Sequence, residues 1–212
     1  MTTEFIVVRH GETAENLKGI LQGQLDTQLN ALGLRQAECV AERLKHEALD
    51  LAFSSDLSRA KITAEKIAGP HRLPVITLKA LREWDLGDLQ GRLISEAVRE
   101  MPDLTAAFQS DIDEIRIPGG ESRSTFYQRV ADCLDELALR FPGKRILLVS
   151  HGGTIRSMFH HIAGAVPGDS RLPLTSNTGV SSFRVVDGRW QLVSWNDVSH
   201  LRAIEENESS AF

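Results

Sequence analysis

Residues 5–13 read Phe-Ile-Val-Val-Arg-His-Gly-Glu-Thr, and this stretch decides the fold. Its first half is an unbroken apolar run of strand length, which is typical of a strand buried on both faces of a helix-covered parallel sheet. Its polar half begins where that strand must end. Residues 146–153, Ile-Leu-Leu-Val-Ser-His-Gly-Gly, repeat the same design. We therefore expect two buried strands that each lead through a His-Gly pair into a helix.

The rest of the chain alternates between apolar runs of strand length and amphipathic segments of helix length. Strands are predicted at Glu4–Arg9, Leu51–Phe53, Val75–Leu78 and Arg145–Ser150, followed by a hairpin of Val180–Val186 and Trp190–Trp195 around Asp187-Gly188. Helices are predicted at Asn30–Leu49, Asp56–Ala68, Glu121–Phe141 and from the second His-Gly pair to Ala163. This order predicts an α/β fold with a mostly parallel, mixed sheet, helices on both faces and one antiparallel strand from the hairpin.

Two of these helices carry clear local signals. The first has an apolar stripe at helical spacing that consists of Leu34, Ala37, Ala41, Leu44 and Ala48. The second has Asp56 as its expected N-cap and Gly69-Pro70 as its stop signal.

The chain has 212 residues, which is the length of one large domain, and no internal repeat is visible, so we expect a single domain over 1–212. The stretch 87–120 is rich in glycine and proline and is the least regular part. We interpret it as a helical insertion that forms a lid or wall over the functional site. Residues 205–212 are polar and are expected to be a frayed tail.

Composition excludes several classes of protein. The net charge is −5 and no basic stripe is visible, which argues against a nucleic-acid partner. The longest aliphatic runs are far shorter than the about 20 residues of a membrane-spanning helix, and the N-terminus lacks the features of a signal peptide. The two cysteines, Cys39 and Cys133, both fall in predicted helices and are expected to be buried free thiols. We expect a cytoplasmic protein, and the sequence leaves open whether it forms a homodimer.

Three predicted strands end in residues suited to bind an anion. Ligands in open α/β sheets bind outside the carboxyl ends of the strands, and these ends carry Arg9, His10, His151 and, in the first turn of a helix, Arg59. Guanidinium groups match phosphate oxygens, and helix N-termini add backbone donors. A histidine kept neutral by neighbouring cations can also attack phosphorus. The pattern therefore predicts phosphoryl transfer to a histidine.

The leaving oxygen in such a reaction needs a proton, and Glu83 is the candidate donor. It follows a predicted strand and lies beside Trp84, where partly apolar surroundings would favour a carboxyl that acts as general acid.

Other polar residues near these motifs have different interpretations. Glu12 is interpreted as structural, and Thr13 either caps a helix or contacts substrate. The adjacent His160 and His161 cannot share one helix face, so we interpret them as packing or surface residues rather than a metal pair.

These motifs together resemble the histidine phosphatase superfamily, also called the phosphoglycerate mutase-like family, over nearly the whole chain. The matching elements are Arg9-His10-Gly11-Glu12-Thr13, Asn16, Gln22-Gly23, Ser58-Arg59-Ala60, Glu83 to Gly91, Pro118 to Ser122, Ser150-His151-Gly152 and Asn177. The resemblance implies that His10 is the phosphorylated nucleophile, that Arg9, Arg59 and His151 bind the phosphoryl group, and that Glu83 donates the proton. Asn16, Gln22, Gly23, Gly152, Asn177 and Thr13 would be further substrate contacts. No cofactor or metal ion is implied.

One departure from the family pattern concerns Ile20, because many members carry an arginine there. The absence of that arginine weakens the case for a doubly phosphorylated or strongly acidic substrate.

The leading function is hydrolysis of a small phosphorylated metabolite. A phosphoglycerate mutase-type transfer is the main alternative, but residues 106–117 lack the basic surplus of a mutase. A metallohydrolase and an inactive phospho-ligand-binding module are less well supported. The sequence does not name the substrate, and it leaves His200 either in the pocket wall or in packing.

Overall fold

The computed structural model describes residues 1–102, 117–164, 174–202 and 204. Within these ranges the strands are β1 (Thr2–Arg9), β2 (Leu51–Ser54), β3 (Val75–Thr77), β4 (Arg145–Ser150), β5 (Val180–Val186) and β6 (Arg189–Asp197). The α-helices are α1 (Ala14–Lys18), α2 (Ala31–Leu44), α3 (Ser58–Ala68), α4 (Ile94–Glu100), α6 (Arg123–Arg140) and α7 (Gly152–Ala163). Short 3-10 helices are η1 (Gly69–His71), η2 (Lys79–Leu81), η3 (Gly87–Leu89) and η4 (Ser199–Leu201).

The strands form one sheet in the order β3-β2-β4-β1-β5-β6. Strands β3, β2, β4 and β1 are mutually parallel, whereas β5 runs antiparallel to both β1 and β6. The predicted mixed, mostly parallel sheet is thus confirmed, and β5 is the antiparallel strand that the hairpin was expected to add. Its turn residues Asp187 and Gly188 both have positive φ angles, 50° and 74°, as a tight hairpin turn requires.

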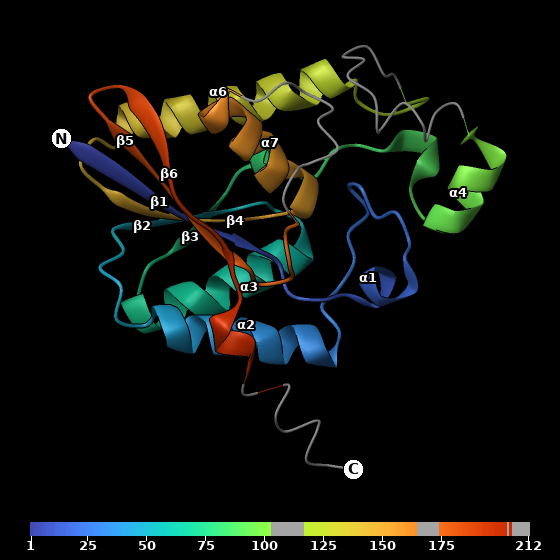
Figure 1. Cartoon of the computed structure of the whole chain (residues 1–212). Coiled ribbons are helices and arrows are strands. Elements are labelled where there is room, and N and C mark those ends of the chain that lie inside the picture. The colour runs from blue at the N-terminus through green and yellow to red at the C-terminus, as the bar shows by residue number, and fades with distance from the viewer. Residues whose placement is uncertain (103–116, 165–173, 203, 205–212) are drawn as a thin grey trace.

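Alternating residues of the central strands enter two separate cores. Phe5 and Val7 of β1 face α6 and α7 together with Ile146 and Leu148 of β4, whereas the intervening Ile6 and Val8 face α2 and α3. Helices α6 and α7 cover one face of the sheet, and α2 and α3 cover the other (Figure 1). The unbroken apolar run that opened the sequence analysis follows directly from this burial on both faces.

The apolar stripe predicted for the 30–49 helix is confirmed at Ala37, Ala41 and Leu44 and wrong at both ends. Helix α2 ends at Leu44, its Leu34 is 39% exposed, and Ala48 beyond it is also exposed. The buried face carries Gly33, Gln36, Ala37, Val40, Ala41 and Leu44. At the start of the helix, the small Gly33 lets the first turn of α2 pack directly on the backbone of Glu12, so Gly33 rather than Leu34 is buried there.

The predicted N-cap of the next helix is also wrong. Helix α3 begins at Ser58, and the N-cap residue Leu57 makes no side-chain cap. The carboxylate of Asp26, from a distant loop, accepts hydrogen bonds from the Ser58 amide at 2.7 Å and its hydroxyl at 2.9 Å. Asp56 pairs with Arg82 at 2.6 Å instead. A tertiary contact therefore replaces the local cap, which no local sequence signal could reveal.

The segment 87–120 is described in part and contains η3 and α4 beyond the carboxyl end of the sheet (Figure 1). Leu86, Leu89, Ala97 and Ile117 form a small core of their own there. Residues 103–116 and the predicted tail lie outside the described residues.

Cys133 is buried as expected, but Cys39 is partly exposed on α2, and both thiols are free. No helix in the described ranges is long and apolar enough to span a membrane.

Helix α2 also fixes the loop that follows β1. Asn30 caps α2 by accepting from the Gly33 amide at 2.7 Å, and its side chain donates to the Glu12 carboxylate at 2.8 Å. The Glu12 amide donates to Gln36 at 2.9 Å. Glu12 is thus a structural residue, as expected, and the loop rests on the first turns of α2.

We predict that Gly33→Ala destabilises the protein by about 1–3 kcal/mol, the usual effect of overpacking. The added methyl group would collide with the main chain of Glu12, which cannot move without shifting the histidine loop. Urea unfolding followed by circular dichroism measures the change. Gly69→Ala is the matched control, because Gly69 has φ −54° and nothing lies within 4 Å of its new methyl group. Equal stability of the two variants would contradict the proposed close packing.

Candidate active site

The two His-Gly pairs lie side by side because β1 and β4 are adjacent and in register. Arg9 of β1 pairs with Ser150 of β4, so His10 and His151 leave the sheet together. Their ring centroids are 5.2 Å apart with an interplanar angle of 59°. Strand β2, on the other side of β4, leads into α3, which carries Arg59 in its first turn.

His10 is held as a neutral ring with one defined tautomer. Its Nδ1 lies 2.7 Å from the carbonyl oxygen of Gly11, so Nδ1 carries the proton and donates it. The Nε2 lone pair is then left on the other side of the ring, where the Arg59 Nε–H approaches it at 3.3 Å. Burial, then the charges of Arg59 and Arg9, hold the pKa of His10 well below its usual value. Neutral imidazole with a lone pair at Nε2 is the form that can attack an electrophile.

His151 is fully buried at the N-cap position of α7. Neither of its ring nitrogens has a hydrogen-bond partner among the described residues. Burial is the largest cause that lowers the pKa of His151 well below its usual value, followed by the charge of Arg59. Its ring packs against His10, although His151 is not among the described residues that line the cavity.

Arg59 and Arg9 are anchored by backbone carbonyl groups. Arg59 donates to the carbonyl oxygens of Leu25 at 2.6 Å and Gly23 at 2.8 Å, and Arg9 donates to Thr175 at 2.6 Å. The Nε of Arg9 is buried with no partner among the described residues. Burial lowers the pKa of Arg59 to about 10, which leaves it charged at neutral pH. Because carbonyl groups carry no net charge, both guanidinium groups keep their full positive charge at the site.

The surroundings of Glu83 are more polar than the sequence suggested. Its carboxylate accepts hydrogen bonds from the backbone amides of Gly153 at 2.9 Å and Thr154 at 3.0 Å, at the N-terminus of α7. The Trp84 amide adds a third at 3.0 Å. The neighbouring Trp84 ring stacks on Phe126, with ring centroids 5.5 Å apart. Helix α7 thus fixes both His151, at its N-cap, and the carboxylate of Glu83.

These groups surround a cavity of about 860 Å³. Of the predicted residues, Arg9, His10, Asn16, Gln22, Gly23, Arg59, Glu83 and Gly152 line it. Thr13 lies outside the lining and is the N-cap of α1, where it forms a reciprocal capping box with Asn16. Asn177 also lies outside it, and its side-chain amide donates to the carbonyl oxygen of His10 at 3.0 Å. Both residues contact the loop that follows β1.

Two further arginines, Arg123 and Arg156, line the cavity. Neither of them was identified from the sequence. Arg123 follows the Gly-Gly-Glu-Ser motif directly and lies 5.8 Å over the Trp84 ring, so its place beside that motif could have identified it. Arg156 lies in α7 just beyond the second His-Gly pair. Glu83 is the sole acidic residue among the described lining residues, so the cavity is positively charged inside an acidic protein.

A third missed arginine, Arg129 of α6, holds the loop that carries Glu83. It donates to the carbonyl oxygens of Ala80 at 2.8 Å and Arg82 at 3.1 Å, and pairs with the Glu121 carboxylate at 2.8 Å. Its position on α6 gives no sequence signal for this role.

The remaining residues that the sequence analysis discussed have these positions. Ile20 lines the cavity, while His200 lies elsewhere, in packing against α2. His160 is buried and His161 bonds to Asp135, which agrees with packing roles. The described residues contain no cluster of His, Cys, Asp and Glu that could hold a metal ion.

Comparison with protein families agrees with this geometry. A model of the histidine phosphatase superfamily (branch 1) matches residues 5–198. The chain belongs to this family. The resemblance carried by the sequence motifs is thus confirmed, and the fold class with it.

Similar proteins include phosphatases from distant organisms. The chain is 40% identical over 205 residues to a metal-independent phosphoserine phosphatase of Arabidopsis thaliana, with 95% of this chain and 84% of that protein covered. It is 43% identical over 202 residues to phosphoglycerate mutase-like protein 4 of the same plant, with 93% and 86% covered. A mutant phosphoserine phosphatase of Entamoeba histolytica, solved with phosphoserine, aligns with a TM-score of 0.86 at 32% identity, covering 94% of this chain and 99% of that one. The same enzyme has been solved with 3-phosphoglyceric acid.

We predict that this histidine phosphatase loses stability in mild acid. Because the pKa values of His10 and His151 are lowered on folding, the unfolded chain binds more protons than the folded one below about pH 6.5. The stabilisation is therefore fully present above that pH and decreases as the pH falls, by up to about 1.4 kcal/mol per pH unit for each histidine. Urea unfolding between pH 5.5 and 7.5 measures this slope. The double variant His10→Gln/His151→Gln should flatten it, and an unchanged slope would refute the assignment.

Proposed function

We propose that this member of the family is a phosphomonoesterase that hydrolyses a small phosphorylated metabolite through a phosphohistidine at His10. The observation that carries the proposal is the state of the His10 ring. It is neutral, its Nδ1–H is bound to the Gly11 carbonyl oxygen, and its Nε2 faces a guanidinium group in a positively charged cavity. A passive anion site would need the cations but not this ring.

In the first step, Nε2 of His10 attacks phosphorus and forms a P–N bond while the ester P–O bond breaks. Glu83, in its protonated form, gives its proton to the departing alkoxide, which leaves as the alcohol. Arg9 and Arg59 hold the phosphoryl oxygens and balance their charge, which is the main catalytic contribution in phosphoryl transfer, and His151, as a neutral ring, donates a hydrogen bond to one of those oxygens. The Arg59 Nε–H donates to His10 Nε2 in the free protein, and it would donate to the phosphoryl group instead when substrate enters.

In the second step, a water molecule attacks phosphorus from the side that the alcohol has left. Glu83, now ionised, accepts a proton from that water, and the P–N bond breaks so that neutral His10 and inorganic phosphate result. The same carboxylate therefore serves as acid and then as base. Its three backbone hydrogen bonds keep it in place through both steps. Asn16, Gln22, Gly23 and Gly152 are proposed as further substrate contacts in the cavity wall.

The substrate class that we favour is a small phosphomonoester that also carries a carboxylate. Arg123 and Arg156 supply cationic groups in the cavity beyond those at the strand ends. The related phosphatase solved with phosphoserine and with 3-phosphoglyceric acid binds ligands of this kind. A mutase remains the competing function because of the mutase-like relative. Ile20 in the cavity wall argues against it, since an arginine is frequent there in the family.

A direct test separates these functions. We expect purified protein to release inorganic phosphate from phosphoserine or 3-phosphoglycerate, and intact-mass measurement after neutral quenching to show one added phosphate that His10→Ala lacks. A mutase would instead isomerise 3-phosphoglycerate with little phosphate release, and an inactive module would bind without turnover. Phosphate release by His10→Ala at the wild-type rate would refute the proposed nucleophile.

We predict that the effect of Glu83→Gln depends on the leaving group. An alkyl phosphate expels a strongly basic alkoxide, so loss of the acid should slow phosphoenzyme formation by about 10²–10⁴-fold. An aryl phosphate expels a stable phenolate and should still phosphorylate His10 at nearly the normal rate. Because the base for the second step is also lost, the aryl substrate should then give a burst of phenolate and an accumulated phosphoenzyme.

Rapid-quench kinetics with an alkyl and an aryl phosphate measure both rates. Glutamine retains one oxygen, which can still accept from the Thr154 and Trp84 amides, so the loop should keep two of its three hydrogen bonds and lose only the one from Gly153. An equal loss of phosphoenzyme formation on both substrates would contradict the acid role and leave Glu83 as a positioning group only.

A further inference from the structure

Residues 177–178 form hydrogen bonds to the main chain of the proposed nucleophile, His10. The Thr178 amide donates to the carbonyl oxygens of Arg9 at 3.0 Å and of His10 at 3.3 Å. The Asn177 side chain donates to the same His10 carbonyl at 3.0 Å. Residues 177–178 thus fix the peptide groups on both sides of the His10 α-carbon, and with them the direction of its ring.

Thr178 holds this position in a strained conformation. Its φ angle is 54°, in the left-handed region that β-branched residues rarely adopt. It is also fully buried. Such a conformation persists only where the surrounding contacts enforce it, and it is most often found at functional sites. The contacts of the Thr178 side chain therefore matter for the geometry of the loop.

His200 supplies one of these contacts, and its tautomer is fixed from both sides. The Thr178 hydroxyl donates its proton to the Asn177 carbonyl oxygen at 2.8 Å, so at 3.1 Å the His200 Nε2 must be the donor to that hydroxyl. On the other side Arg43 approaches Nδ1 at 3.2 Å, and a guanidinium can only donate. Nδ1 is therefore the acceptor, and the ring is neutral with its proton at Nε2.

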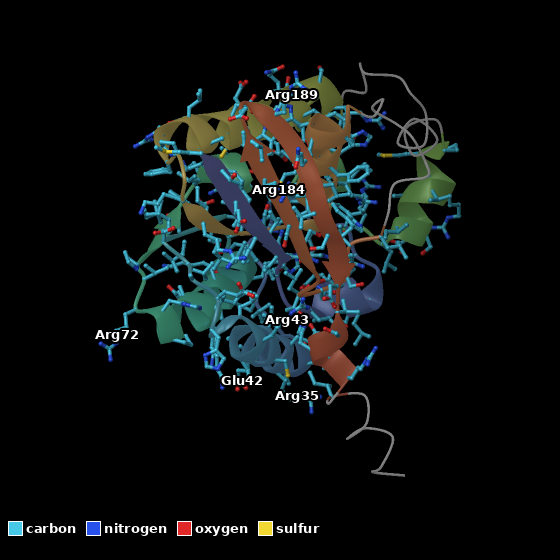
Figure 2. The ribbon with its side chains drawn as sticks, turned by 60° about the vertical axis from the view of Figure 1, so that its left-hand side comes forward. Arg35, Glu42, Arg43, Arg72, Arg184 and Arg189 are labelled. Carbon is cyan, nitrogen blue, oxygen red and sulfur yellow. The ribbon has the colours of Figure 1, made fainter. Side chains whose placement is uncertain are left out.

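Arg43 is itself anchored, which makes the arrangement rigid. It donates to the Asp197 carboxylate at 2.6 Å and to the Asp197 carbonyl oxygen at 3.1 Å. Figure 2 shows Arg43 on α2, at the place where the β5–β6 hairpin and η4 approach that helix. Burial, followed by the charge of Arg43, lowers the pKa of His200 to about 4, in agreement with the neutral tautomer.

We propose that His200 is a positioning residue for phosphoryl transfer, which acts through Thr178 to fix the backbone of His10. This inference rests on the proposed function of His10. His200 does not line the active-site cavity; it lines a second cavity on the α2 side with Arg35, Cys39 and Arg43. It reaches the nucleophile only through the segment 177–178. Arg59 and Gly152 come from other elements, and the Arg9 guanidinium is anchored separately by the Thr175 carbonyl oxygen, so phosphate binding should depend on His200 much less than the transfer step does.

The test compares His200→Leu with His200→Gln. Leucine removes both hydrogen bonds, so we expect kcat to fall by about 10- to 100-fold, the range that small misplacements of a reacting group produce. The inhibition constant for inorganic phosphate should stay within about twofold of wild type, because the anion-binding groups remain. Glutamine can still donate to the Thr178 hydroxyl and should recover most of kcat. His161→Leu is the matched control, since that histidine also makes a side-chain hydrogen bond, to Asp135, away from His10.

A double-mutant cycle shows whether the effect passes through Thr178. Thr178→Gly removes both the hydroxyl and the strain, so His200→Leu should have little further effect on kcat in that background. A full loss in that background, an unchanged kcat in His200→Leu, or a parallel loss of kcat and phosphate affinity would each overturn the proposal.

A non-kinetic measurement separates this proposal from the proposed function. In long-range ¹H–¹⁵N NMR spectra, His200→Leu should shift the ring signals of His10, whereas His161→Leu should not. If wild-type protein forms no phosphohistidine, the proposed function fails, and the NMR comparison alone then decides whether His200 positions the His10 ring. Unchanged His10 signals in His200→Leu would refute that role.

Discussion

The in-register parallel pairing of β1 with β4 is the constraint on which the site depends. Arg9 and Ser150 occupy the same level of the ladder, so the His-Gly pairs that follow them must leave the sheet together. No loop has to bring the two imidazoles within 5.2 Å of each other, because the backbone hydrogen bonds of the sheet already do so. A shift of one residue would move Phe5 and Val7 out of the α6–α7 core and into the core under α2 and α3.

Positive charge at the strand ends is retained because the arginines are anchored by neutral groups. Arg59 and Arg9 donate to carbonyl oxygens, whereas Arg82, outside the cavity lining, is neutralised by Asp56. Carbonyl anchors satisfy the donors of a buried guanidinium without cancelling its charge. The site therefore attracts an anion in a protein of net charge −5, and the same cations add to the effect of burial, which is the larger cause of the lowered pKa of His10. Anion binding and the neutral state of the proposed nucleophile thus share an electrostatic contribution.

The sequence predicted correctly those features that follow from hydrophobic pattern and from the position of residues at strand ends. Unbroken apolar runs predicted the buried parallel strands, and the carboxyl-end rule placed Arg9, His10, Arg59 and His151 at one edge of the sheet. The failures concern contacts between distant segments. Asp56 looks like a cap, but Asp26 from another loop supplies it, and Gly33 is buried against the backbone of Glu12, which is far from it in sequence. Periodicity and local propensity describe one element at a time, so they cannot reveal such contacts.

The division of the cavity between two kinds of element explains how one chemistry can serve different substrates in this family. The proposed phosphoryl-binding groups and the nucleophile come from strand ends and from the first turns of α3 and α7, where the sheet fixes their positions, and Glu83 comes from the loop after η2. The far wall comes from α4 and α6, with Ile94, Val98 and Tyr127 beside Arg123. Part of that wall rests on a separate small core of Leu86, Leu89, Ala97 and Ile117. Because this core is distinct from the two that pack on the sheet, its residues can change, and the wall with them, while the histidines keep their geometry.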